Sequence, residues 1–169
     1  MKEGIAFTGV PSKEELEKAP GIPTKERLER GPVAIIECFQ VIPCNPCTSA
    51  CPFGAISMEE FPSLPRLNEE KCIGCGLCIP ACPGLAIFVI DKTYSQTEAL
   101  VSFPYEFLPV PDVGMEVDAV NRNGEVVTKG RVVKVKNDKR SDHTLIITIS
   151  VPKEWAEDVR FISLNSVKR

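Results

Sequence analysis

The placement of the cysteines constrains this chain more than any other feature. All eight cysteines of the 169-residue sequence lie between Cys38 and Cys82. A disulfide scaffold would spread its cysteines over the fold and would need an oxidising compartment, which nothing else in the sequence indicates. The one histidine, His143, lies far along the chain from the thiols. A metal site here must therefore be built from thiolates, which favours zinc or iron–sulfur clusters.

The second half of the cysteine segment has the spacing C-x2-C-x2-C-x3-C-P. It reads Cys72-Ile-Gly-Cys75-Gly-Leu-Cys78-Ile-Pro-Ala-Cys82-Pro83. Three thiolates at this spacing can wrap one face of a cubic cluster, and Gly74 and Gly76 let the backbone pass close to it. A pair of zinc sites could use C-x-x-C pairs, but the third and fourth cysteines would then be surplus. The spacing therefore predicts iron–sulfur clusters, with zinc as the weaker alternative.

The first half of the segment repeats this pattern imperfectly. A shift of 31 residues places Cys44, Cys47 and Cys51 on Cys75, Cys78 and Cys82. The same shift predicts a cysteine at position 41, where Val41 stands, and Cys38 lies three residues upstream instead. We expect Cys38 to be a ligand, because otherwise one iron would lack a protein sulfur. The alternative is a buried apolar thiol at the end of a strand over 33–37, with a three-iron cluster or an outside ligand.

These motifs make residues 33–103 resemble a bacterial-type two-cluster ferredoxin. The resemblance implies a pseudo-twofold pair of β-α-β units that holds two [4Fe–4S] clusters. In that family the fourth cysteine of each motif ligates the other cluster. The resemblance therefore implies a first cluster held by Cys38, Cys44, Cys47 and Cys82. It implies a second cluster held by Cys51, Cys72, Cys75 and Cys78.

The local sequence around the cysteines supports such a unit. Residues 33–37 predict a strand, and short strands at 55–58 and 66–67 flank a proline-broken turn. Residues 86–90 and 99–103 predict a second hairpin.

The rest of the chain differs in character, so we expect an α+β protein in which the ferredoxin-like domain is followed by a small all-β, barrel-like domain. Residues 1–32 form an N-terminal arm, in which Ser12 and Glu15 fit the capping box of a short helix. Residues 104–112 predict a proline-rich linker whose apolar side chains are covered. Residues 113–169 predict strands at 116–120, 125–127, 131–136, 144–151 and 161–164, with a break at Lys129-Gly130 and a helical turn after Pro152.

Composition excludes several classes of function. The formal net charge of −3 gives no electrostatic reason to expect nucleic acid as a partner. The longest apolar run, Leu85 to Ile90, is far short of the roughly 20 residues of a membrane helix. The N-terminus lacks the apolar core of a signal peptide. We therefore expect a cytoplasmic protein without membrane insertion.

Two clusters on adjacent half-repeats form a short path for electrons, and the sequence shows no nucleophile, general base or open metal site. The sequence thus predicts electron transfer without a catalytic site of its own. The chain also resembles the small iron–sulfur subunit of multi-subunit flavin-dependent dehydrogenases of amino acids or related amines. That resemblance rests on residues 31–38, 42–47 and 102–107 and on the appended β-domain. It implies a hetero-oligomer in which partner subunits carry FAD or FMN. The alternatives are a free-standing ferredoxin-type carrier and a redox- or iron-sensing module.

Overall fold

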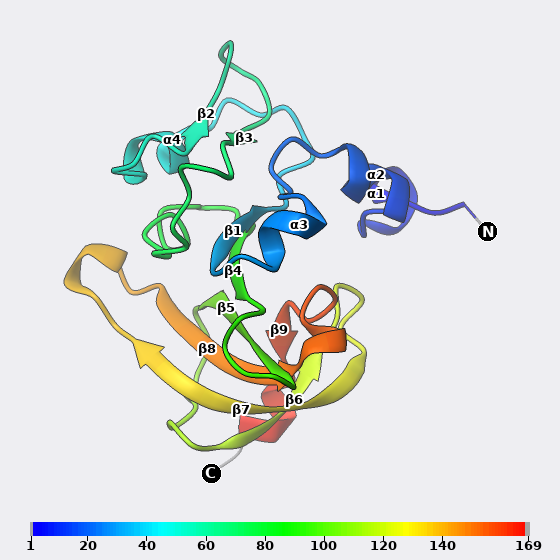
Figure 1. Cartoon of the computed structure of the whole chain (residues 1–169), viewed down its shortest axis with the longest axis vertical. Helices are drawn as coiled ribbons and strands as arrows, with labels where there is room; N and C mark the ends of the chain where they lie inside the picture. The colour runs from blue at the N-terminus through cyan, green and yellow to red at the C-terminus, as the bar shows by residue number, and fades with distance from the viewer. Residues whose placement is uncertain (1, 168–169) are drawn as a thin grey trace.

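The computed structural model describes residues 2–167, apart from the side chain of Arg140. Within that range the chain is mixed α/β and is built on one antiparallel sheet of seven strands (Figure 1). In sheet order these are β1 (Val33–Ile36), β4 (Ile87–Asp91), β5 (Glu98–Tyr105), β8 (Leu145–Pro152), β7 (Val126–Lys136), β6 (Glu116–Val120) and β9 (Phe161–Ile162). A separate pair, β2 (Ile56–Ser57) and β3 (Arg66–Leu67), lies in the cysteine-rich part.

The first strand is buried on both of its faces. Val33 and Ile35 belong to the larger core, which extends into the C-terminal half of the chain. Ala34 and Ile36 point the other way, into a smaller core that contains Cys47 and Cys78. A strand buried on both faces needs an unbroken apolar run, which Val-Ala-Ile-Ile supplies. The predicted strand is confirmed, and it connects the cysteine region to the rest of the fold.

Strand β5 extends further than the sequence predicts. Pro104 and Tyr105, which we expected to open a linker, are its last two residues and are buried. They pair with Ile146 and Leu145 of β8. The Tyr105 hydroxyl donates a 2.8 Å hydrogen bond to the Pro109 carbonyl. Proline is tolerated at this position because β5 pairs with β4 only at residues 100–102, so that Pro104 has a neighbouring strand, β8, on one side alone. The linker prediction is therefore wrong at its first two residues, which belong to β5.

Strand β7 is one continuous strand, so the predicted break at Lys129-Gly130 is also wrong. Gly130 pairs with Val117, and a Cβ atom there would lie 3.1 Å from the Ser150 carbonyl oxygen. The glycine therefore marks a close approach of neighbouring strands, which sequence patterns cannot distinguish from a turn. The irregularity falls instead between Val132 and Lys134, where the register with β8 shifts.

The sheet curls so that its last strand returns to β5. Phe161 of β9 lies 5.2 Å from Phe103 and 5.5 Å from Tyr105, measured between ring centroids. These rings close the larger core between strands that are far apart in the sheet order. The expected strand at the end of the chain thus completes this core.

The helices are short. They are α1 (Ile5–Thr8), α2 (Lys13–Lys18), α3 (Lys25–Leu28) and α4 (Pro46–Ala50), with 3₁₀ turns η1 (Lys139–Ser141), η2 (Lys153–Trp155) and η3 (Leu164–Val167). The predicted capping box of α2 is confirmed, because Ser12 and Glu15 accept hydrogen bonds from each other's backbone N–H. Residues 77–81, which correspond to α4 in the repeat, form turns, consistent with Pro80 interrupting any helix there. No helix among the described residues combines the length and apolar character needed to cross a bilayer.

Candidate metal centres

Four thiols gather around the end of β1. Burial, followed by the charges of Cys82, Cys44 and Cys38, raises the pKa of Cys47 to about 11. Burial, followed by Cys82 and Cys44, also raises the pKa of Cys38. The structure thus brings together the four cysteines that the resemblance assigns to a first cluster, including Cys38 in place of a cysteine at position 41.

A second set of four thiols lines one cavity beside β1. Burial, followed by the charges of Cys72 and Cys75 and then of Cys51, raises the pKa of Cys78 to about 12. The space that these four cysteines line is about 320 Å³ and is partly open to solvent. Each set therefore contains one cysteine from the other motif, Cys82 in the first and Cys51 in the second.

Backbone N–H groups point at the sulfurs in a way that repeats between the two motifs. The N–H of Ala55 donates to the Cys51 sulfur at 3.3 Å, and that of Ala86 donates to the Cys82 sulfur at 3.4 Å. In both motifs the donor follows its cysteine by four residues. The N–H of Ala34 in β1 donates to the Cys72 sulfur at 3.4 Å. Such donors stabilise a thiolate over a thiol, and they tune the potential of a cluster bound through it.

Gly74 is required by the path of the loop that contains Cys72, Cys75 and Cys78. Its φ is +65°, and a Cβ atom there would lie 2.5 Å from the Cβ of Pro32. Only glycine therefore lets this loop lie against the residue that precedes β1.

Arg27 ties the same loop to the residues that precede β1. This buried arginine of α3 donates to the carbonyl groups of Glu69, Gly31, Pro32 and Cys72, at 2.9, 3.0, 3.0 and 2.6 Å. Sequence reasoning missed this residue, because nothing in the N-terminal arm marks an arginine whose partners are backbone carbonyl groups far along the chain.

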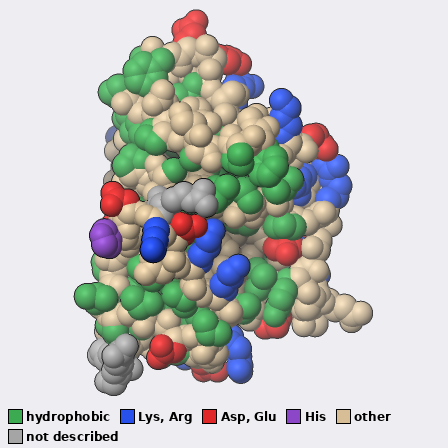
Figure 2. All heavy atoms as spheres, turned by 90° about the vertical axis from the view of Figure 1, so that its left-hand side faces the viewer, with side chains coloured by type: hydrophobic (Ala, Val, Ile, Leu, Met, Phe, Trp, Pro, Cys, Tyr) green, Lys and Arg blue, Asp and Glu red, His purple; other side chains and the backbone are tan. Residues whose placement is uncertain are grey.

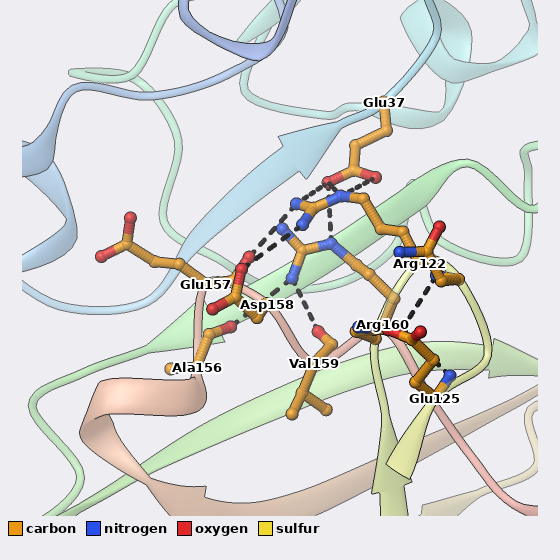
Figure 3. A network of polar contacts seen from close by, with 10 residues as sticks. Glu37, Arg122, Glu125, Ala156, Glu157, Asp158, Val159 and Arg160 are labelled. Carbon is orange, nitrogen blue, oxygen red and sulfur yellow. Dashed lines mark hydrogen bonds and ion pairs between the residues drawn. The ribbon is translucent and has the colours of Figure 1, made fainter. Parts of the chain in front are cut away.

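A second unpredicted contact joins the end of β1 to the C-terminal half (Figure 3). Glu37, next to Cys38, accepts hydrogen bonds from Arg122 at 2.6 Å and from Arg160 at 2.7 Å. Burial raises the pKa of Glu37, but the positive charges of Arg160 and Arg122 more than offset this and hold the pKa below its usual range. The Arg160 guanidinium also donates to the Val159 carbonyl oxygen and lies 5.2 Å from the centroid of the Phe88 ring. The network fixes the direction in which the chain leaves β1 toward Cys38.

The donor set fits iron–sulfur clusters. All eight cysteines are free thiols. Buried thiols that are packed together resist losing their protons, so binding as thiolates requires a cationic partner that offsets their mutual repulsion. Among residues 2–167, no three Cys, His, Asp or Glu side chains are placed to share a single metal ion. Cys38, Cys44, Cys47 and Cys82 would hold one cluster and the remaining four cysteines the other, and such clusters supply one-electron redox chemistry.

Comparison with known proteins supports this assignment over part of the chain. Residues 42–86 match the family described as the 4Fe-4S dicluster domain. The polyferredoxin-like subunit of an aliphatic sulfonate oxidoreductase from Pyrococcus furiosus is 45% identical over 53 residues, which are 31% of this chain and 28% of that protein. One subunit of an ion-translocating oxidoreductase complex from Methanosarcina acetivorans is 46% identical over 46 residues, 27% of this chain and 17% of that protein.

A longer and weaker similarity extends beyond the cysteines. The translation initiation factor rli1 of Schizosaccharomyces pombe is 29% identical over 126 residues, 68% of this chain and 21% of that protein. The aligned part of this chain thus spans between 17% and 28% of the length of these three relatives. No solved structure matches the chain. The comparisons therefore support a 4Fe-4S dicluster domain at residues 42–86, the segment that the family model matches.

Proposed function

We propose that the chain is the electron-transfer subunit of a larger flavin-containing oxidoreductase. One observation carries the proposal: two four-thiol groups lie against the same small core, and each is completed by a cysteine of the other motif. In the proposed ligation, Cys38, Cys44, Cys47 and Cys82 hold one [4Fe–4S] cluster. Cys51, Cys72, Cys75 and Cys78 hold the other. Electrons then enter at one cluster and leave at the other.

The proposed partner is a flavoprotein dehydrogenase of amino acids or related amines, whose FAD or FMN exchanges electrons with the clusters. Support for membership of a complex comes from two relatives that are named as subunits of oxidoreductases. The sequence resemblance to small iron–sulfur subunits supports the flavin and the substrate class. Under this proposal the partner binds substrate, and this chain only conducts electrons.

The appended sheet supports a fixed subunit over a small diffusing carrier. We propose that residues 33–103 act as the ferredoxin unit and residues 113–169 as a barrel-like unit that presents the clusters to the complex. Eight cysteines without a disulfide are typical of a reducing compartment, which supports a cytoplasmic location.

The proposal is tested by purifying the native protein anaerobically from its own cells at low salt. We expect it to elute in a complex that contains stoichiometric flavin, and an amino acid or amine substrate should bleach both the flavin and the cluster absorption. A flavin-free protein with the mass of one chain would overturn the complex and favour the free-standing carrier. If the protein instead binds a partner without a redox centre, and does so in only one oxidation state of its clusters, a sensing module would be favoured.

A further inference from the structure

Cys75 lies beside a groove whose other wall comes from the C-terminal half of the chain. Cys75 is exposed, whereas the other seven cysteines are half-buried or buried. The groove contains about 670 Å³ of space and is lined by Cys75 and its neighbours Gly74 and Gly76 on one side. Lys134 and Lys136 of β7 line the other side. Residues from these two distant segments line one groove because the loop that holds the second cysteine motif lies next to the hairpin that joins β7 to β8 (Figure 1).

The two lysines of this groove, Lys134 and Lys136, carry no ion-pair partner among residues 2–167, whereas Lys129 of the same strand lies 2.6 Å from Asp118. The acidic residue that lines the groove is Asp91, and its carboxylate accepts the N–H and the hydroxyl of Thr93. The two lysines therefore place unpaired positive charge beside Cys75, next to the negative charges of Asp91 and of the thiolates, in a chain whose formal net charge is −3.

An apolar rim lies next to these lysines. Ile73 and Leu77 flank Cys75 in sequence and are 54% and 38% exposed, and Phe53 across the same cysteine site is 45% exposed. On the face shown in Figure 2, hydrophobic side chains lie beside Lys and Arg side chains. Exposed apolar side chains bordered by unpaired charges are typical of a protein–protein contact whose orientation is set by electrostatics.

We propose that this surface, composed of Phe53, Ile73, Cys75, Leu77, Lys134 and Lys136 and called here the Cys75 surface, is where an acidic patch of a redox partner protein docks. The proposal deepens the proposed electron-transfer function and rests on it. The partner's acidic side chains pair with the two lysines, while its apolar centre covers Ile73 and Leu77. Electrons then cross between the partner's redox centre and the cluster held by Cys51, Cys72, Cys75 and Cys78. The net negative charge of the rest of the chain repels the same partner and thereby disfavours other orientations.

The test uses the full-length, cluster-loaded protein, reduced anaerobically and mixed in a stopped-flow instrument with anionic hexacyanoferrate(III) or cationic hexaamminecobalt(III). The site variant is Lys134→Glu/Lys136→Glu. The matched control is Lys13→Glu/Lys25→Glu, which makes the same change in net charge on two exposed lysines of α2 and α3. At low salt we expect the site variant to slow oxidation by the anion roughly tenfold relative to the control, and added salt should remove the difference. The cation should show the opposite order.

Competition then identifies the class of partner. Polyglutamate should slow oxidation of the wild type by hexacyanoferrate(III) at low salt, and should do so much less for the site variant. Equal rates for the site variant and the control would overturn the proposal. Stronger competition by oligodeoxythymidylate than by polyglutamate would also overturn it, in favour of a nucleic acid. The neutral variant Lys134→Gln/Lys136→Gln should show an intermediate effect. If the protein contains its clusters but its oxidation rate does not depend on Lys134 and Lys136, only the docking role of the Cys75 surface is refuted. If the clusters are absent, the proposed function itself is refuted.

Discussion

Replacing Glu37 with Gln should loosen the junction between the cysteine sites and the C-terminal half of the chain. The substitution keeps the shape of the side chain and removes its charge. The side chain of Glu37 is 9% exposed, that of Arg160 7% and that of Arg122 15%. Burial, opposed by the charge of Glu37, leaves the pKa of Arg160 at about 10, so this arginine is a cation at neutral pH. Glu37→Gln therefore leaves two largely buried cations without their shared carboxylate.

Removing one partner of a buried ion pair costs about 3–5 kcal/mol. Because Arg122 is partly exposed and Arg160 keeps its bond to the Val159 carbonyl oxygen, we expect the lower end, about 3 kcal/mol. An exposed pair offers the matched control. Glu59 lies 3.5 Å from Arg66, and its side chain is 73% exposed, so Glu59→Gln should cost less than about 1 kcal/mol.

The assay follows the loss of visible cluster absorption from the holoprotein in guanidinium chloride under anaerobic conditions. Glu37→Gln should lose its clusters at a clearly lower denaturant concentration than Glu59→Gln, because its destabilisation is several times larger. If the two variants lose their clusters at the same concentration as the wild type, the reasoning about the buried network is wrong.

Three further substitutions test the candidate sites. Cys38→Ser should convert the cluster also held by Cys44 and Cys47 to a three-iron or oxygen-ligated form, while electron paramagnetic resonance shows the other cluster unchanged; two unperturbed four-iron signals would show that Cys38 is only a buried thiol. Gly74→Ala should destabilise the second site by roughly 2–4 kcal/mol in the same absorption assay, because backbone strain and overpacking add. The control is Gly114→Ala, which is also at positive φ but has no atom within 4 Å of the new Cβ, so it should show the backbone strain alone. Arg27→Lys cannot satisfy four carbonyl groups and should cost about 1–3 kcal/mol, measured as faster loss of the second cluster; a rate like that of the wild type would refute its positioning role.

Those parts of the fold that depend on local spacing could be predicted from the sequence. The resemblance to two-cluster ferredoxins implies which thiols lie together, and the structure groups them in that way. The capping box at Ser12, the strand at 33–36 and the two hairpins around the cysteines likewise follow from patterns within a few residues of one another.

What the sequence could not predict depends on contacts between distant segments. Tyr105 stays in β5 because β8 and Phe161 bury it, although three prolines in residues 104–111 are typical of a linker. Arg160 pairs with Glu37, 123 residues away, and neither residue belongs to a recognisable motif. The position of Lys134 beside Cys75 also depends on how the C-terminal sheet folds back.

The most direct test of the account is the metal and sulfide content of the anaerobically purified wild type, combined with electron paramagnetic resonance during a reductive titration. The account predicts about eight iron and eight sulfide per chain, and two four-iron signals that appear on reduction. Stoichiometric zinc without visible charge-transfer absorption would contradict it.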